Sequence, residues 1–115
     1  MMIFVTVGTH EQQFNRLVEY MDKWGRDHYE DVVIQTGFSD YIPKYAQYKT
    51  LFTYSDMIDN VTKARVVITH GGPSSFIMPL QMGKIPIVVP RKKENEEHVN
   101  NHQLEIIDNF EKQGY

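Results

Sequence analysis

The residues best suited to bind a ligand form the run Thr69-His70-Gly71-Gly72-Pro73-Ser74-Ser75, between a predicted strand and a predicted helix. Its glycines let a ligand approach the backbone, and the first N–H groups of a helix carry a partial positive charge that suits phosphate. We therefore expect His70 through Ser75 to meet a diphosphate. The alternative is a turn whose glycines only let the chain reverse tightly. Neither the Walker lysine nor the dinucleotide-binding glycine spacing is present.

Two further glycine turns follow the first two predicted strands, at Gly8-Thr9-His10 and at Thr36-Gly37. In nucleotide-binding sheets such turns approach phosphate groups or sugar hydroxyls. His10 precedes Glu11 and is the candidate acid or base, because an imidazole titrates near neutral pH. The alternative is a histidine that only forms hydrogen bonds within its loop.

A polar segment near the end of the chain, Asn101-His102-Gln103, offers hydrogen-bond donors and acceptors for phosphate, ribose or hexose hydroxyls. The alternative is the polar start of a helix. His98 and His102 are separated by one helical turn, but the glutamate that zincins place between their histidines is missing and no third ligand is evident. We therefore expect no metal ion.

Arg91, together with Lys92 and Lys93, could neutralise phosphate or an anionic lipid headgroup. The acidic residues that follow offset these charges, so a solvated loop is the alternative interpretation. The sequence suggests no serine triad, and it contains no cysteine. Any chemistry is therefore expected to be group transfer that relies on positioning and electrostatics, without a cofactor.

The composition predicts one soluble, cytoplasmic domain that spans residues 1–115. A chain of 115 residues has room for a single hydrophobic core. No apolar run approaches the roughly 18 residues of a membrane span, and the N-terminus does not resemble a secretory signal. A net charge of −3 and a pI near 5.9 argue against a nucleic-acid partner, which would require clustered lysine and arginine.

Short apolar strands alternate with amphipathic helices along the chain. Strands are predicted at residues 3–7, 32–35, 49–54, 66–69 and 85–89. Helices are predicted at residues 14–24 with a stop at Gly25, after a cap at Ser55, and at 74–82, where Pro79 should kink or confine the helix. Parallel neighbours require crossover connections, so the alternation predicts an α/β fold with a Rossmann-like, doubly wound parallel sheet. All of the candidate loops then converge on the carboxyl edge of that sheet.

A last, amphipathic helix is predicted after the charged loop 91–97. It is marked by residues that recur at helical spacing: Val99, Gln103, Ile106, Ile107 and Phe110. Gly114 lies near its end.

Taken in order, several of these motifs resemble the C-terminal-domain family of GT-B glycosyltransferases. They are residues 3–10 with Phe14-Asn15-Arg16-Leu17, then Gln35-Thr36-Gly37, residues 69–75, Gly83-Lys84, Ile87-Val88-Val89-Pro90-Arg91 and residues 97–103. The likeness is greatest to small bacterial capsular or exopolysaccharide glycosyltransferase subunits. It is more distant to the eukaryotic subunit that adds the second N-acetylglucosamine to a dolichol-linked sugar.

The resemblance implies a UDP-sugar donor and a polyprenyl-diphosphate-linked sugar acceptor. It also implies a membrane-anchored partner subunit that supplies the N-terminal half of the enzyme and recruits this chain to the inner face of the membrane. It favours β-1,4-galactosyl transfer from UDP-galactose, without a metal. Gly8 and Thr9 would line the donor cleft, and Tyr54 would lie near uracil. Gly71 to Ser75 would meet the diphosphate, and His102-Gln103 would contact sugar or phosphate.

The chain departs from this family at two places. Many relatives have Glu or Asp, which holds the ribose hydroxyls, five residues before the glycine that matches Gly83, and this sequence has Met78 there. The chain also ends at Tyr115, earlier than such subunits usually do, so a C-terminal truncation of the domain is expected. Two alternatives follow: a non-catalytic enhancer or binding subunit, and a UDP-sugar 2-epimerase-like protein of similar fold.

Overall fold

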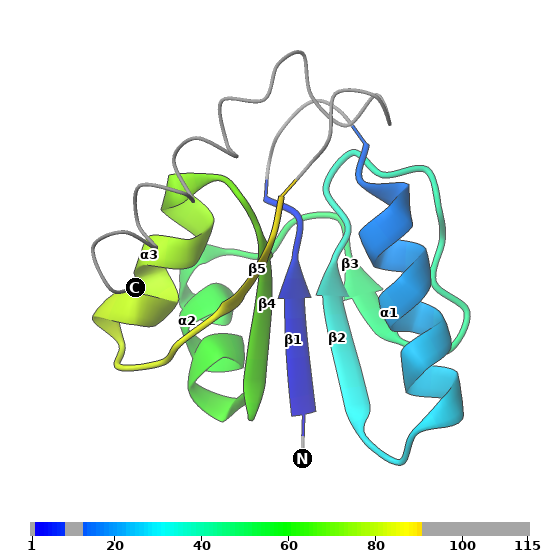
Figure 1. Cartoon of the computed structure of the whole chain (residues 1–115), viewed down its shortest axis with the longest axis horizontal. Helices are drawn as coiled ribbons and strands as arrows, with labels where there is room; N and C mark the ends of the chain where they lie inside the picture. The colour runs from blue at the N-terminus through cyan, green and yellow to red at the C-terminus, as the bar shows by residue number, and fades with distance from the viewer. Residues whose placement is uncertain (1, 9–12, 91–115) are drawn as a thin grey trace.

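The computed structural model describes residues 2–8 and 13–90, which form one parallel sheet with helices on both faces (Figure 1). The strands follow the spatial order β3-β2-β1-β4-β5. They are β1 (Met2–Thr6), β2 (Asp31–Gln35), β3 (Gln47–Lys49), β4 (Val66–His70) and β5 (Ile87–Val89). The helices are α1 (Asn15–Asp27), α2 (Tyr54–Lys63) and α3 (Pro73–Gln81). The predicted doubly wound α/β fold is confirmed.

The two faces of the sheet bury alternate residues of the same strands, as the period of two in a strand requires. Ile3 and Val5 of β1 pack with Leu17 and Met21 of α1. Phe4, between them in sequence, lies in a second core cluster on the opposite face. Its other buried members are Val61, Ala64 and Val67. Figure 1 shows α1 on one side of the sheet and α2 and α3 on the other. Burial on both faces explains why β1 and β4 read as continuous apolar runs.

Several element boundaries differ from the sequence-based prediction. α1 continues past Gly25 to Asp27, and a side chain at Gly25 would approach Val32 Cγ2 to 3.1 Å. This glycine therefore allows close packing of helix and strand and does not end the helix. Thr53, not Ser55, caps α2, because its Oγ1 accepts the Asp56 N–H at 3.1 Å. Pro79 lies in the last turn of α3, and the helix ends two residues later at Gln81.

β3 and β5 are shorter than predicted. β3 is Gln47–Lys49 rather than residues 49–54, because the strand that pairs with β2 is an exposed, polar edge strand. The apolar residues that attracted the prediction lie after the strand has ended. β5 starts at Ile87 instead of residue 85, after Pro86, which has no N–H to donate to a ladder.

The long connection between β2 and β3 is held by one buried carboxylate. Asp22 of α1 has no exposed surface, and it accepts hydrogen bonds from the Tyr41 hydroxyl (2.9 Å) and from the backbone N–H groups of Lys44 (2.9 Å), Tyr45 (2.8 Å) and Ala46 (2.8 Å). Burial by itself would raise the pKa of Asp22, but these hydrogen bonds outweigh it and the pKa lies below its ordinary value. The connection therefore enters β3 in a fixed position beside β2.

Candidate functional site

The strand order reverses at β1, and this switch point is where open parallel sheets bind ligands. β1 leads by α1 to β2 on one side, whereas β4 pairs with β1 on its other side. Thr6 and Thr69 are register partners, so the turns that follow them leave the sheet side by side. The first and third glycine turns predicted from the sequence, at Gly8 and at Gly71-Gly72, are thereby brought together at the carboxyl ends of β1 and β4.

His70 fills the space between these two turns. It is 5% exposed, and both of its ring nitrogens are hydrogen-bonded within the site. Nδ1 accepts the Gly72 N–H at 3.2 Å, and Nε2 lies 2.8 Å from Ser75 Oγ. Because Nδ1 acts as an acceptor, the neutral ring carries its proton on Nε2 and donates it to Ser75. His70 therefore organises the turn, which the sequence did not reveal.

The His70 ring takes up the space that a side chain would need at two positions of the site, Gly8 and Gly72. A Cβ at Gly8 would overlap Nε2 of His70, and a Cβ at Gly72 would overlap Cε1. Gly8 also has φ +71°, a conformation that side chains disfavour. The Gly72 N–H donates to Nδ1 of His70 in this structure, so a ligand would have to compete with the ring for it.

Gly8→Ala is expected to lower the free energy of unfolding by about 2 kcal/mol, from the positive φ and the overlap with His70. In a His70→Ala background the overlap disappears, and the same substitution should cost about 1 kcal/mol less. Urea unfolding of the two single variants and the double variant measures this coupling. Additive effects would mean that His70 does not restrict Gly8.

The Thr36-Gly37 turn lies against the Gly8 turn. Gly37 has φ +56°, and a Cβ there would come within 2.7 Å of the Gly8 carbonyl oxygen. The Thr36 N–H donates to Lys49 O and the Gly37 N–H donates to Thr50 O, both at 2.9 Å, so this turn is tied to the end of β3. The carboxyl ends of β1, β2 and β4 therefore present three glycine-containing turns at one edge of the sheet.

Gln35 links these turns through its side chain. Its Nε2 donates to Thr6 Oγ1 at 2.9 Å, and Thr6 Oγ1 also accepts the Gly8 N–H at 3.1 Å. Its Oε1 accepts the Phe52 N–H at 2.9 Å. In the sequence Gln35 is one residue of a motif, whereas in the structure its side chain holds the turns in position. It connects the ends of β1 and β2 to the segment that leads into α2.

The start of α3 follows directly from the His70 turn. Gly72 is its N-cap and supplies no capping side chain, while the Ser75 N–H donates to Gly72 O at 3.0 Å. The α3 N-terminus is thus directed at the switch point, the arrangement that favours an anion. The side chains of Pro73 and Ser74 are not among those described.

Of the remaining predicted site residues, the structure describes Tyr54. Tyr54 is 73% exposed at the first turn of α2, so its ring face is available for stacking. Six predicted site residues lie outside the described part of the chain: Thr9, His10, Arg91, Asn101, His102 and Gln103. Their roles stay predictions.

Two side chains on the α2 and α3 face of the sheet bear on the site. Met78 packs against the core cluster around Phe4, so the position where many relatives carry a ribose-binding carboxylate is used here for apolar packing. Thr69 is fully buried, and its Oγ1 finds no hydrogen-bond partner among residues 2–8 and 13–90. An unpaired buried hydroxyl lowers stability, and the sequence did not suggest it.

Within residues 2–8 and 13–90, no three His, Asp or Glu side chains gather as a metal site would require. No helix in the same part of the chain is long and apolar enough to cross a membrane.

Comparisons with known proteins agree with this architecture. Residues 2–115 match the model of the glycosyltransferase family 28 C-terminal domain. The chain is 30% identical over 124 residues to UDP-N-acetylglucosamine transferase subunit ALG13 from Homo sapiens, which covers 98% of this chain and 10% of the human protein. The corresponding protein of Mus musculus is 30% identical over 97% of the chain and 10% of its own length. The ALG13 subunit of Yarrowia lipolytica is 37% identical over 60 residues, 51% of this chain and 29% of its own.

The chain spans about a tenth of the human and mouse relatives that it matches. No solved structure matches it. The relatives carry the name of a eukaryotic UDP-N-acetylglucosamine transferase subunit, whereas the sequence had suggested greatest likeness to bacterial capsular subunits. The family match covers almost the whole chain and agrees with the parallel sheet, its helices on both faces and its glycine turns. The chain therefore belongs to the glycosyltransferase family 28 C-terminal domain family.

Proposed function

We propose that this chain binds a UDP-sugar at the carboxyl ends of β1 and β4 and acts as the donor-binding subunit of a two-chain glycosyltransferase. The observation that carries the proposal is the meeting of the Gly8, Gly37 and Gly72 turns beside the N-terminus of α3. Membership of a glycosyltransferase family supports a nucleotide-sugar as the ligand.

The proposed chemistry is hexose transfer without a metal. A glycosyl transfer leaves UDP with added negative charge on its diphosphate, and a helix N-terminus stabilises such charge. The start of α3 is suited to this role because its N-terminus is directed at the switch point. His10 remains the candidate to deprotonate the acceptor hydroxyl, or the partner subunit supplies that base.

The finer assignment concerns which sugar is transferred. The family resemblance favours galactose, in a β-1,4 linkage, for capsule or exopolysaccharide synthesis. The names of the human and mouse relatives favour UDP-N-acetylglucosamine instead. The two sugars differ in the acetamido group at C2 and in the configuration at C4, so competition between the two donors distinguishes them.

The proposed partner is a membrane-anchored subunit that supplies the other half of the cleft and brings a polyprenyl-diphosphate-linked acceptor. The word subunit in the relatives' name supports a two-chain enzyme. This chain would then work in the cytoplasm, at the inner face of the membrane. The second candidate function is a non-catalytic binding or enhancer subunit, which the apolar packing of Met78 favours because it removes a ribose contact.

Isothermal titration of the whole chain with UDP, UDP-N-acetylglucosamine and UDP-galactose tests the donor site. We expect saturable heat from UDP and from one of the two sugars. Radiolabelled transfer to a lipid-linked acceptor, with the partner subunit added, then tests catalysis. Binding without transfer supports the enhancer function, and interconversion of UDP-sugars without acceptor supports the 2-epimerase alternative. No heat with any of the three ligands would reject the site.

A further inference from the structure

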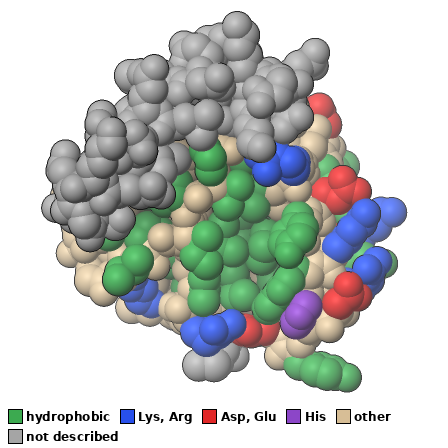
Figure 2. Space-filling view, viewed as in Figure 1, with side chains coloured by type: hydrophobic (Ala, Val, Ile, Leu, Met, Phe, Trp, Pro, Cys, Tyr) green, Lys and Arg blue, Asp and Glu red, His purple; other side chains and the backbone are tan. Residues whose placement is uncertain are grey.

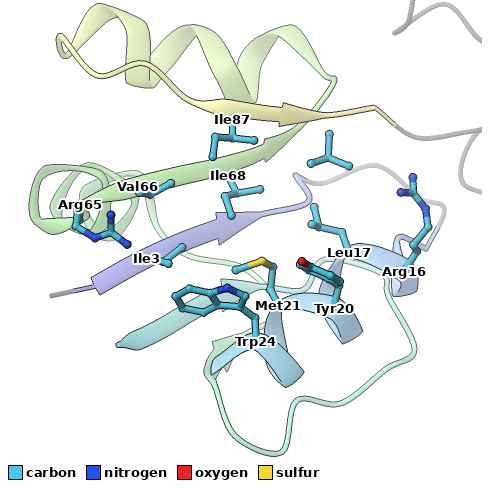
Figure 3. A pocket seen from close by; sticks show the side chains of 11 residues that line it. Ile3, Arg16, Leu17, Tyr20, Met21, Trp24, Arg65, Val66, Ile68 and Ile87 are labelled. Carbon is cyan, nitrogen blue, oxygen red and sulfur yellow. The ribbon is translucent and has the colours of Figure 1, made fainter. Parts of the chain in front are cut away.

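The two faces of the sheet offer different surroundings to a polar ligand. On the α1 face, a groove of about 670 Å³ with a mostly apolar lining lies between α1 and the strands β1, β4 and β5 (Figure 3). Figure 3 shows Met21 and Trp24 of α1 facing Ile68 and Ile87 of the sheet, and Figure 2 shows hydrophobic side chains gathered on this face. A nucleotide in such a groove would lose more hydrogen bonds to water than the lining returns. The polar contacts that shape the proposed donor site are therefore expected elsewhere, at the carboxyl edge.

Two buried polar side chains lie at that edge, on the α2 and α3 face of the sheet. Thr6 and Gln35 are register partners on β1 and β2, and they are 1% and 4% exposed. They follow Phe4 and Val33 by two positions, so they share the face of the core cluster around Phe4. Burying such groups is unfavourable unless they are paired, so their hydrogen bonds indicate what they hold in place.

Three hydrogen bonds join this pair to two separate segments of the chain. The Gly8 N–H donates to Thr6 Oγ1 at 3.1 Å, and Gln35 Nε2 donates to the same oxygen at 2.9 Å. Gln35 Oε1 in turn accepts the Phe52 N–H at 2.9 Å. Phe52 lies two residues before Tyr54, where α2 begins. The Thr6–Gln35 bridge, as we call these two side chains, therefore connects the Gly8 turn to the start of α2.

The end of the bridge at Phe52 is anchored by its ring as well. The Phe52 ring packs against Phe4 in a T-shaped pair with centroids 5.8 Å apart, and Lys49 Nζ lies 5.7 Å from the Phe52 centroid. A residue held through both its ring and its N–H cannot shift without breaking packed contacts. Tyr54, which is 73% exposed, is therefore held at a set distance from the Gly8 turn.

We infer that Gln35 is a positioning residue that keeps two parts of the donor site, the Gly8 turn and the Tyr54 ring, at a fixed separation. This inference rests on the proposed UDP-sugar site. A nucleoside diphosphate has two parts, a base that stacks on an aromatic ring and a diphosphate that meets the glycine turns. The two parts reinforce each other's binding only while the protein holds both subsites at the spacing of the ligand. Both ends of the Gln35 amide are engaged within the protein, so Gln35 acts through that spacing and not by touching the ligand.

Binding of UDP, uridine and inorganic pyrophosphate to the whole chain tests this role. Gln35→Met keeps the approximate length of the side chain and removes both of its hydrogen bonds. It should weaken UDP binding at least tenfold in calorimetry, while the affinities for uridine and for pyrophosphate, followed by NMR titration, should change less than threefold. Gln47→Met is the matched control, because it makes the same substitution at an exposed position of β3. It should leave all three affinities unchanged.

Thr6 provides an independent break in the same bridge. Thr6→Val keeps the shape of the side chain without its hydroxyl and should reproduce the pattern of Gln35→Met, whereas Thr6→Ser keeps the hydroxyl and should retain most of the UDP affinity. The double variant Gln35→Met, Thr6→Val should lose no more UDP affinity than the weaker-binding single variant, because both changes break one connection. Circular dichroism and urea unfolding define conditions in which each variant is fully folded, and the titrations are made there.

The outcomes separate this inference from the donor site itself. If folded Gln35→Met and Thr6→Val chains bind UDP as tightly as the unaltered chain, the inference is wrong and the donor site stands. An equal loss of affinity for UDP, uridine and pyrophosphate would also overturn it, because that pattern indicates general damage to the site. If the unaltered chain does not bind UDP, the donor site is rejected and the inference fails with it.

Discussion

Gly72→Asp is expected to weaken UDP binding at least tenfold, or by about 1.4 kcal/mol. The substitution places a carboxylate at the N-cap of α3, beside the N–H groups proposed to meet the diphosphate. Like charges within a few ångströms at a partly shielded site repel by up to several kcal/mol. Isothermal titration with UDP measures the loss.

Gly72→Asn separates charge from bulk in this experiment. Asn has the shape of Asp, so both variants push on the His70 ring to the same extent. Only Asp adds a charge, and the difference in UDP affinity between the two variants should shrink as salt is raised. Thermal melting of both variants reports any loss of folded protein. Equal affinities of the Asp and Asn variants for UDP would move the phosphate site away from Gly72.

Asp22→Asn is expected to lower the free energy of unfolding by about 2–3 kcal/mol, although it changes no exposed surface. Each carboxylate oxygen of Asp22 accepts two hydrogen bonds. An amide replaces one of those oxygens with an NH₂ group, which then faces two hydrogen-bond donors at a buried position. Urea unfolding measures the change. Asp27→Asn on the same helix is the control, because that carboxylate is exposed and should matter little.

The same carboxylate predicts an acid sensitivity. The pKa of Asp22 is lower in the folded chain than the value of about 3.9 expected when unfolded. Its contribution to stability is therefore complete above about pH 4 and is lost as the pH falls through the folded pKa. Stability measured between pH 7 and pH 3 should decline more steeply for the native chain than for Asp22→Asn. Parallel curves would show that Asp22 does not carry this dependence.

The sequence was most informative where burial alone determines structure. β1 and β4 were located to within one residue because strands buried on both faces need continuous apolar runs. The Gly8 and Gly72 turns were correctly predicted to lie together, because the carboxyl ends of parallel strands share an edge. The α/β class followed from the same alternation of elements.

The sequence was least informative where a polar side chain acts at a distance. Asp22 reads as part of the polar face of an amphipathic helix, yet its four partners lie 19 to 24 residues further along the chain. His70 reads as a ligand-binding residue, yet its ring packs against Gly8, 62 positions earlier in the sequence. β3 was misplaced because an exposed edge strand has no apolar pattern. Such contacts depend on tertiary structure, which local periodicity does not encode.

The ring of His70 touches both Gly8 and Gly72, and this has an evolutionary consequence. A side chain at either glycine would force the imidazole to shift. A lineage that first replaces the histidine with a small residue opens room at both positions. Among family members the three positions should therefore covary, with larger residues at the glycine positions only where the histidine has been lost.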